Sequence, residues 1–117
     1  MKKNTKYNFK KGSVEMLLLH ILKEEGDCYG YQLSQMISSL SDGILLIPEG
    51  SLYPALYKLL DNDYISEEKR LVGKRLTRVY YHIKPSGEDR LNQLVQEYYD
   101  ANNAIQKILS YTKGDTK

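Results

Sequence analysis

Glu49-Gly50-Ser51-Leu52-Tyr53-Pro54-Ala55-Leu56-Tyr57-Lys58-Leu59-Leu60 is the segment that decides the fold of this chain. Its four leucines recur at helical spacing, which predicts a short helix with one apolar side. Four residues are left off that side: Ser51, Tyr53, Tyr57 and Lys58. Two starting points stay open for this helix. A start near Ser51 places Pro54 in the first turn, where its missing N–H has no intrahelical partner, whereas a start at Glu49 predicts a kink at Pro54.

A cationic β-hairpin is predicted after this helix. Two extended segments, residues 64–70 and 75–83, are joined by residues 71–74. In the second segment, buried-type side chains alternate with polar ones at the period of two that is typical of a strand with one buried face. The outer face and the tip hold the cations of the hairpin, which are Lys69, Arg70, Lys74, Arg75 and Arg78.

Two further helices are predicted upstream. Residues 13–26 and 29–40 both carry apolar side chains at helical spacing, and the Ser-Asp-Gly cluster at 41–43 ends the second pattern. The apolar run at 44–47 is predicted to be a short strand or an extended connector. Residues 1–11 are polar and rich in lysine, which indicates a flexible basic arm.

A long helix is predicted from Pro85 to residue 112. About 25 residues span about 40 Å at 1.5 Å per residue, so this helix overhangs a domain of this size and needs a partner for its apolar stripe. We expect that partner to be the same helix of a second copy, and packing on the chain's own first helix is the alternative. The predicted dimer interface follows steps of three and four and comprises Leu91, Leu94, Val95, Tyr98, Ala101, Ile105 and Ile108.

Composition excludes several classes of protein. The 117 residues fit one domain, and no apolar run approaches the roughly 20 residues that span a bilayer. No secretory signal opens the sequence, so we expect a cytoplasmic protein. Cys28 is the only cysteine, and we expect a small buried side chain rather than a redox sensor. Nucleophile–base pairs, metal clusters and phosphate loops are not recognisable, so we expect no enzyme, no catalytic or metal-binding residues and no cofactor.

Together these elements predict a mainly α protein with a small β-hairpin wing. The expected architecture is a winged helix-turn-helix DNA-binding domain plus a long C-terminal dimerisation helix. The formal charge of +2 is small, but cations crowd the arm and the hairpin whereas acids gather elsewhere, which gives the protein a natural side for a polyanion. The predicted units are an arm at 1–11, the winged-helix domain at 12–84, the dimerisation helix at 85–112 and a tail at 113–117.

Three signatures resemble the PadR family of bacterial transcriptional regulators. They are Tyr29-Gly30-Tyr31-Gln32-Leu33, the run from Gly50 to Leu59, and Lys74-Arg75 followed by Tyr80-Tyr81-His82-Ile83 and Gly87. The resemblance covers nearly the whole chain and implies a third helix in the major groove, a wing on the minor groove or backbone, and a dimerising last helix. With one C-terminal helix the chain is similar to the short PadR subfamily, whose members are usually repressors relieved by phenolic or drug-like molecules near the dimer interface. It departs from the family pattern at Lys84, where a Thr is common, and in having no Trp.

The predicted DNA-binding residues combine the third helix, the wing and the start of the second helix. Base edges need side chains that a rigid element delivers into a groove, while Lys, Arg and hydroxyl groups contact phosphates. The predicted set is Tyr31, Gln32, Ser51, Tyr53, Pro54, Tyr57, Lys58, Lys74, Arg75 and Arg78.

The expected partners are double-stranded DNA with an inverted-repeat operator, a second copy of the chain, and a small aromatic effector. We expect a repressor of transcription. Two alternatives stay open. One is a winged-helix module that binds a protein instead of DNA, and the other is a small-molecule carrier built on the dimer cavity.

Overall fold

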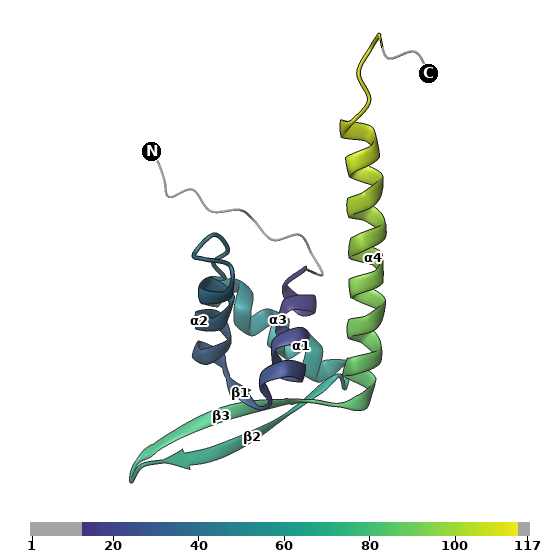
Figure 1. The fold of residues 1–117 in the computed structure, drawn as a ribbon. Helices are drawn as coiled ribbons and strands as arrows, with labels where there is room; N and C mark the ends of the chain where they lie inside the picture. The colour runs from purple at the N-terminus through teal and green to yellow at the C-terminus, as the bar shows by residue number, and fades with distance from the viewer. Residues whose placement is uncertain (1–12, 115–117) are drawn as a thin grey trace.

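The computed structural model describes residues 13–114. Helices α1, α2 and α3 gather on one side of a small sheet, a hairpin projects from them as the wing, and α4 stands at the edge (Figure 1). The prediction of a mainly α winged-helix fold is confirmed; the predicted arm at 1–11 lies outside the described residues. The elements within them are α1 (Ser13–Glu25), β1 (Cys28–Tyr29), α2 (Gly30–Leu40), α3 (Glu49–Asp61), β2 (Ile65–Val72), β3 (Leu76–Ile83) and α4 (Pro85–Leu109).

The sheet contains one strand that the sequence pattern did not predict. It is antiparallel with the order β1-β3-β2, and β1 pairs Cys28 with Tyr81 and Tyr29 with Tyr80. We expected Tyr29 to open the second helix, but α2 begins one residue later, at Gly30. A strand of two residues is too short to show an alternating pattern. Its pairing fixes the start of α2 against the base of the wing.

The core fills the space between the helices and the inner face of the sheet. Cys28 is fully buried in it, as predicted, and burial raises the pKa of its thiol to about 11. The thiol therefore stays protonated and unreactive at neutral pH. The largest fully buried side chains of the core are Leu18, Leu19, Leu22, Leu33, Leu52, Leu56, Leu59 and Ile65.

Helix α3 begins at Glu49, so the alternative start near Ser51 is wrong. Pro48 precedes the first turn, and its carbonyl accepts the N–H groups of Ser51 and Leu52, both at 2.9 Å. Pro54 therefore lies inside the helix and leaves the carbonyl of Gly50 without its usual intrahelical donor. Residues 44–47 upstream form a connector without regular secondary structure and no strand.

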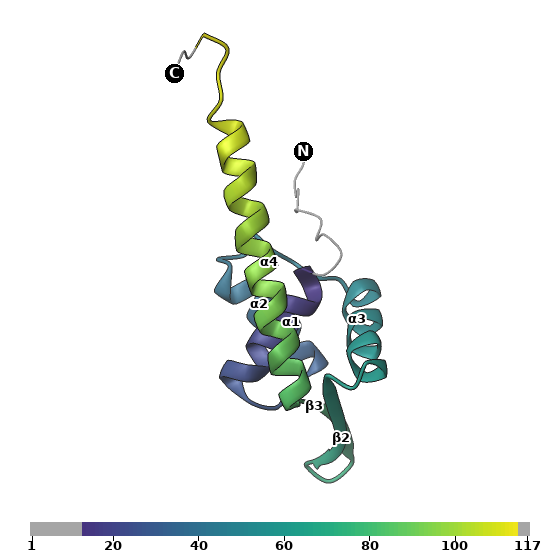
Figure 2. The ribbon, with the colours of Figure 1, turned by 90° about the vertical axis from the view of Figure 1, so that its right-hand side faces the viewer.

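Helix α4 is anchored to the turn that follows α3. Ser86 and Asp89 stand at the spacing of a capping box, but Lys84 is the N-cap and Pro85 the first helical residue. The hydroxyl of Ser86 instead donates to the carbonyl of Asp63 at 2.7 Å. α4 ends at Leu109, three residues before the expected boundary. Its C-terminal half extends beyond the other helices (Figure 2).

Candidate nucleic-acid interface

One side of α3 faces away from the core and is open to solvent. Ser51, Pro54, Tyr57 and Lys58 are all exposed on it, with 56% of Tyr57 accessible. The leucines Leu52, Leu56 and Leu59 hold the opposite side in the core. The helix therefore presents a rigid strip of hydroxyl, ring and ammonium groups, which is what delivery of side chains into a DNA groove requires.

Tyr53 occupies the border of this strip and is half-buried. Its side chain packs on the first turn of α2, where a Cβ added to Gly30 would lie 2.5 Å from the Tyr53 hydroxyl oxygen. The Tyr53 ring also lies beside that of Tyr57, with the ring centroids 6.3 Å apart. The absence of a side chain at Gly30 thus leaves room for the Tyr53 ring beside the backbone of α2. Tyr53 is a contact between the two helices.

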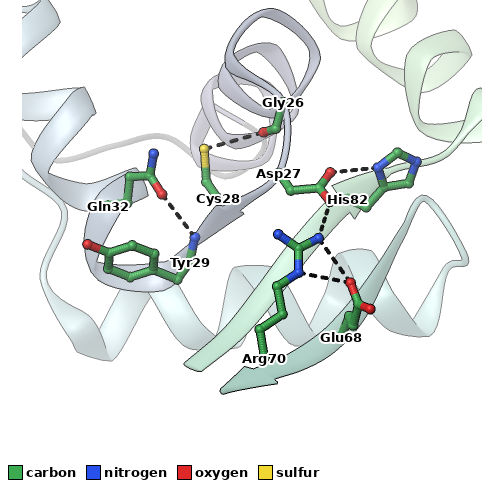
Figure 3. A network of polar contacts seen from close by, with 8 residues as sticks. All are labelled: Gly26, Asp27, Cys28, Tyr29, Gln32, Glu68, Arg70 and His82. Atoms are coloured by element: carbon green, nitrogen blue, oxygen red, sulfur yellow. Dashed lines mark hydrogen bonds and ion pairs between the residues drawn. The ribbon is translucent and has the colours of Figure 1, made fainter. Parts of the chain in front are cut away.

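The start of α2 contributes a second exposed tyrosine. Tyr31 is 62% accessible, whereas Gln32 is half-buried. The Oε1 atom of Gln32 accepts the N–H of Tyr29 at 3.3 Å and so closes the turn between β1 and α2 (Figure 3). Of these two predicted DNA-binding residues, Tyr31 points outward and Gln32 supports the backbone of the turn.

The wing carries its predicted cations at the tip and along one strand. The turn consists of Gly73, Lys74 and Arg75, because β2 ends two residues later than expected, at Val72, and β3 starts one residue later, at Leu76. Gly73 has a φ of +71°, a left-handed conformation that favours glycine. Lys74 and Arg75 are exposed at the tip. Arg78 is half-buried, with its guanidinium carbon 4.2 Å from the centroid of the Tyr29 ring.

Arg70, another predicted cation of the wing, is held by acidic partners. Its Nη2 atom lies 2.6 Å from Oδ2 of Asp27 and 2.9 Å from Oε1 of Glu68, and its guanidinium carbon lies 4.4 Å from the centroid of the Tyr80 ring. Asp27 also contacts Nδ1 of His82 at 2.7 Å, so one carboxylate bridges both long strands (Figure 3). The positive charge of Arg70 is therefore largely compensated within the protein.

Comparison with known proteins decides the family. The family model described as "Transcriptional regulator PadR-like family" matches residues 18–93, which is more than half of the chain. The chain belongs to the PadR family. The prediction of the family is confirmed, and the family is one of transcriptional regulators, which implies regulation through DNA binding.

Two solved structures of transcriptional regulators and one uncharacterized protein are similar to this chain. A transcriptional regulator from Clostridium thermocellum is 34% identical with a TM-score of 0.77, over 83% of this chain and 93% of that chain. A PadR-like transcriptional regulator from Bacillus cereus is 25% identical with a TM-score of 0.70, over 87% and 96% of the two chains. An uncharacterized protein from Lysinibacillus sphaericus is 30% identical over 81% of this chain and 86% of its own length.

The apolar stripe of α4 is divided in this PadR protein. Leu91 and Leu94 are buried in the core of the chain itself, and Val95 is half-buried against it. Within residues 13–114, the part of the stripe beyond Val95 is exposed. Packing on the chain's own core therefore accounts for the N-terminal half of the stripe, while the exposed half comprises Tyr98, Ala101, Ile105 and Ile108.

Among the helices of residues 13–114, none has the length and apolar character that a membrane-spanning segment needs.

No pattern in the sequence predicts the ion pairs of this PadR protein. Asp27 lies 43 residues from Arg70 and 55 from His82. Glu15 of α1 pairs with Lys58 of α3, with Oε2 and Nζ 3.2 Å apart. Opposite charges are frequent in any sequence of this composition, so only the fold selects which of them meet.

Replacing Asp27 by Asn is expected to remove an acid-sensitive part of the stability. The hydrogen bond with His82 contributes most to lowering the pKa of Asp27, and Arg70 adds to it, whereas partial burial opposes them. A carboxylate with a lowered pKa stabilises the fold above its ordinary value of 3.8, and this contribution is lost as the pH falls through the folded-state pKa. At pH 7 the variant should be less stable by up to about 1 kcal/mol.

Thermal unfolding between pH 2 and pH 7 checks this expectation. The difference in unfolding temperature between Asp27→Asn and the wild type should disappear as the pH falls below 3.8, the ordinary pKa of an Asp side chain. Asp42→Asn is the matched control, because Asp42 is exposed and takes part in none of the ion pairs found within residues 13–114. A gap for Asp27→Asn that stays constant with pH, as expected for the control, would contradict the prediction.

Proposed function

We propose that this PadR protein is a homodimeric transcriptional repressor that binds an inverted-repeat operator. The observation that carries the proposal is that α3 stands beside the N-terminal half of α4 and the wing projects at the end of the protein opposite to the free half of α4 (Figure 2). With dimerisation through α4, two α3 helices would enter successive major grooves about 34 Å apart. The wings would contact the flanking backbone or minor groove.

The residues divide into direct contacts and supports. Ser51, Pro54, Tyr57 and Lys58 form the exposed side of α3 and are assigned to the major groove. Tyr31 is assigned to the DNA backbone, because it is exposed in the first turn of α2, where free N–H groups attract phosphate. The wing contacts come from Lys74, Arg75 and Arg78. Tyr53 and Gln32 act by holding α2 and α3 in place.

The exposed half of α4 supplies both the dimer contact and the effector site of this proposal. Tyr98 and Tyr99 make an edge-to-face pair with ring centroids 5.3 Å apart, and both rings are exposed in the single chain. Such rings stack well on flat aromatic molecules. We assign to them a small aromatic effector that binds at the dimer interface and releases the operator.

Binding of the purified protein to a labelled duplex tests the proposal. The duplex carries the region upstream of the protein's own gene, a random duplex serves as competitor, and two salt concentrations are compared. Saturable binding that resists the competitor and weakens with salt is expected. Absence of binding at both salt concentrations would refute the proposal, and a stable complex with a partner protein would then support the alternative of a protein-binding module.

Replacing Lys74 and Arg75 together by Ala is expected to weaken binding to every duplex. Both side chains are exposed at the tip of the wing, so they are free to contact phosphates. Each lost phosphate contact should flatten the slope of log affinity against log salt by about 0.9. The loss should be equal for operator and random DNA, because phosphate contacts carry no base information.

A titration of both duplexes at four or more salt concentrations measures this slope. The matched control is Lys107→Ala with Lys113→Ala, which removes the same charge from exposed positions in the last turn of α4 and just beyond its end. The control should leave the slope near that of the wild type. If the wing variant and the control change the slope equally, the wing makes no phosphate contact.

A further inference from the structure

Glu15 is a buried acid directly behind the proposed DNA-binding side of α3. It is the only charged side chain that is buried within residues 13–114, with 7% of the residue accessible. It lies in the first turn of α1, a helix that packs against α3. Its Oε2 atom is 3.2 Å from Nζ of Lys58, which is itself about half exposed. A negative charge is thus fixed beside the one lysine of α3 that is assigned to DNA.

This pairing changes what Lys58 does. A free lysine on a DNA-binding surface usually contacts phosphates, because its charge displaces condensed counterions and its flexible side chain reaches many positions. Lys58 is tethered instead. If it moved to a phosphate, Glu15 would keep a buried charge without a partner, which is unfavourable. The two charges also cancel, so the pair gains little from the field of the DNA backbone.

The tethered ammonium group still has two N–H groups to donate. A lysine ammonium carries three donors, and the ion pair with Glu15, 3.2 Å away, leaves at least two of them for other acceptors. The N7 and O6 acceptors of guanine lie side by side in the major groove and form a frequent target of lysine. α3 is the element that carries Lys58, and the side chain lies on its exposed side.

We propose that Glu15 is a positioning residue that makes Lys58 a reader of a guanine base instead of a phosphate contact. This inference rests on the proposed function, because it assumes that α3 lies in the major groove. It predicts that the operator contains a guanine at the position that Lys58 contacts. It also explains why an acid is kept close to a surface that otherwise attracts a polyanion.

The test compares Glu15→Gln, Lys58→Gln and the double variant on the operator, on operators with single base-pair changes, and on random DNA. Lys58→Gln should lose about 5- to 150-fold in preference at one G·C pair, with little change in salt slope. Glu15→Gln should relax the same preference and steepen the slope by about 0.9, because Lys58 becomes a free cation. The double variant should resemble Lys58→Gln.

Glu24→Gln is the matched control. It removes the same charge from an exposed position of the same helix, and Glu24 takes part in none of the ion pairs of residues 13–114. Thermal unfolding of every variant separates a folding defect from a change in recognition. If Glu15→Gln does not fold, the Lys58→Gln variant alone tests the inference. This variant should fold, because the Gln amide keeps an N–H donor that can reach Glu15.

Two results would overturn the inference while leaving the proposed function intact. In the first, Lys58→Gln flattens the salt slope by about 0.9 and weakens all duplexes equally, as a phosphate contact does. In the second, both single variants behave like Glu24→Gln on every duplex. Failure of the wild type to bind any duplex would instead refute the proposed function itself.

Discussion

Replacing Ile105 and Ile108 by Asp is expected to make this PadR protein a monomer and to weaken operator binding by about 10²- to 10⁴-fold. Both side chains lie on the exposed half of α4, where Ile108 is 72% accessible in the single chain. Two carboxylates placed there would face the same groups of the partner helix. Dimer contact would then bury unpaired charge, which costs more than the lost apolar contact alone.

The large effect on operator affinity arises because a dimer binds the operator at two sites. Once one α3 helix is bound, the second binds without a further loss of translational freedom, which raises the affinity. A monomer lacks this increase, although its own DNA-binding surface is unchanged. The fold of the single chain should hardly change, because the buried part of the stripe ends at Leu91 and Leu94. Light scattering coupled to size-exclusion chromatography and operator titration measure the two effects.

The control adds the same two charges to the opposite face of α4. Asn92→Asp with Asn103→Asp changes two exposed residues that lie off the apolar stripe, and this variant should stay dimeric and bind the operator. A wild-type protein that is already monomeric at micromolar concentration would contradict the expectation. So would an Ile105→Asp, Ile108→Asp variant that elutes as a dimer.

The parts of the fold that could be predicted are those that repeat a pattern over several turns or residues. The leucines of α3 mark its core side, and the exposure of Ser51, Tyr57 and Lys58 follows from that periodicity. The hairpin shows its alternation in the same way. β1 has only two residues, which is too short for a pattern. The position of Pro54 inside α3 follows from the N-cap at Pro48, which helix propensity alone does not predict.

The candidate site could be predicted only as a surface. Sequence periodicity places Lys58 and Arg70 outside the core, but it does not show that Glu15 binds one and Asp27 the other. The charge available to DNA is therefore smaller than the count of cations indicates. In the same way, the apolar stripe on α4 is continuous in the sequence, but the fold brings α1 beside its N-terminal half alone and leaves the rest of the stripe exposed.

Replacing Gly87 by Ala is expected to destabilise the fold by about 2 kcal/mol or more, although Ala favours helices. Gly87 is buried in the first turn of α4, and a Cβ there would lie 2.2 Å from the carbonyl oxygen of Tyr64 and 2.9 Å from Cγ1 of Ile83. The carbonyl belongs to the backbone and already accepts the N–H of Lys84 at 3.0 Å. It cannot move away without breaking that bond, so the start of α4 must shift instead.

Gly50→Ala provides the opposite result at a comparable place. Gly50 also lies in the first turn of a helix, but a Cβ there meets no atom within 4 Å. The substitution should therefore stabilise the protein by up to about 1 kcal/mol through helix propensity and a less flexible unfolded chain. Denaturant unfolding of both variants measures the difference, and equal signs would contradict the packing argument. Opposite signs would show that the junction between the wing and α4 tolerates no added atom, because the first turn of α4 rests directly on the backbone at Tyr64.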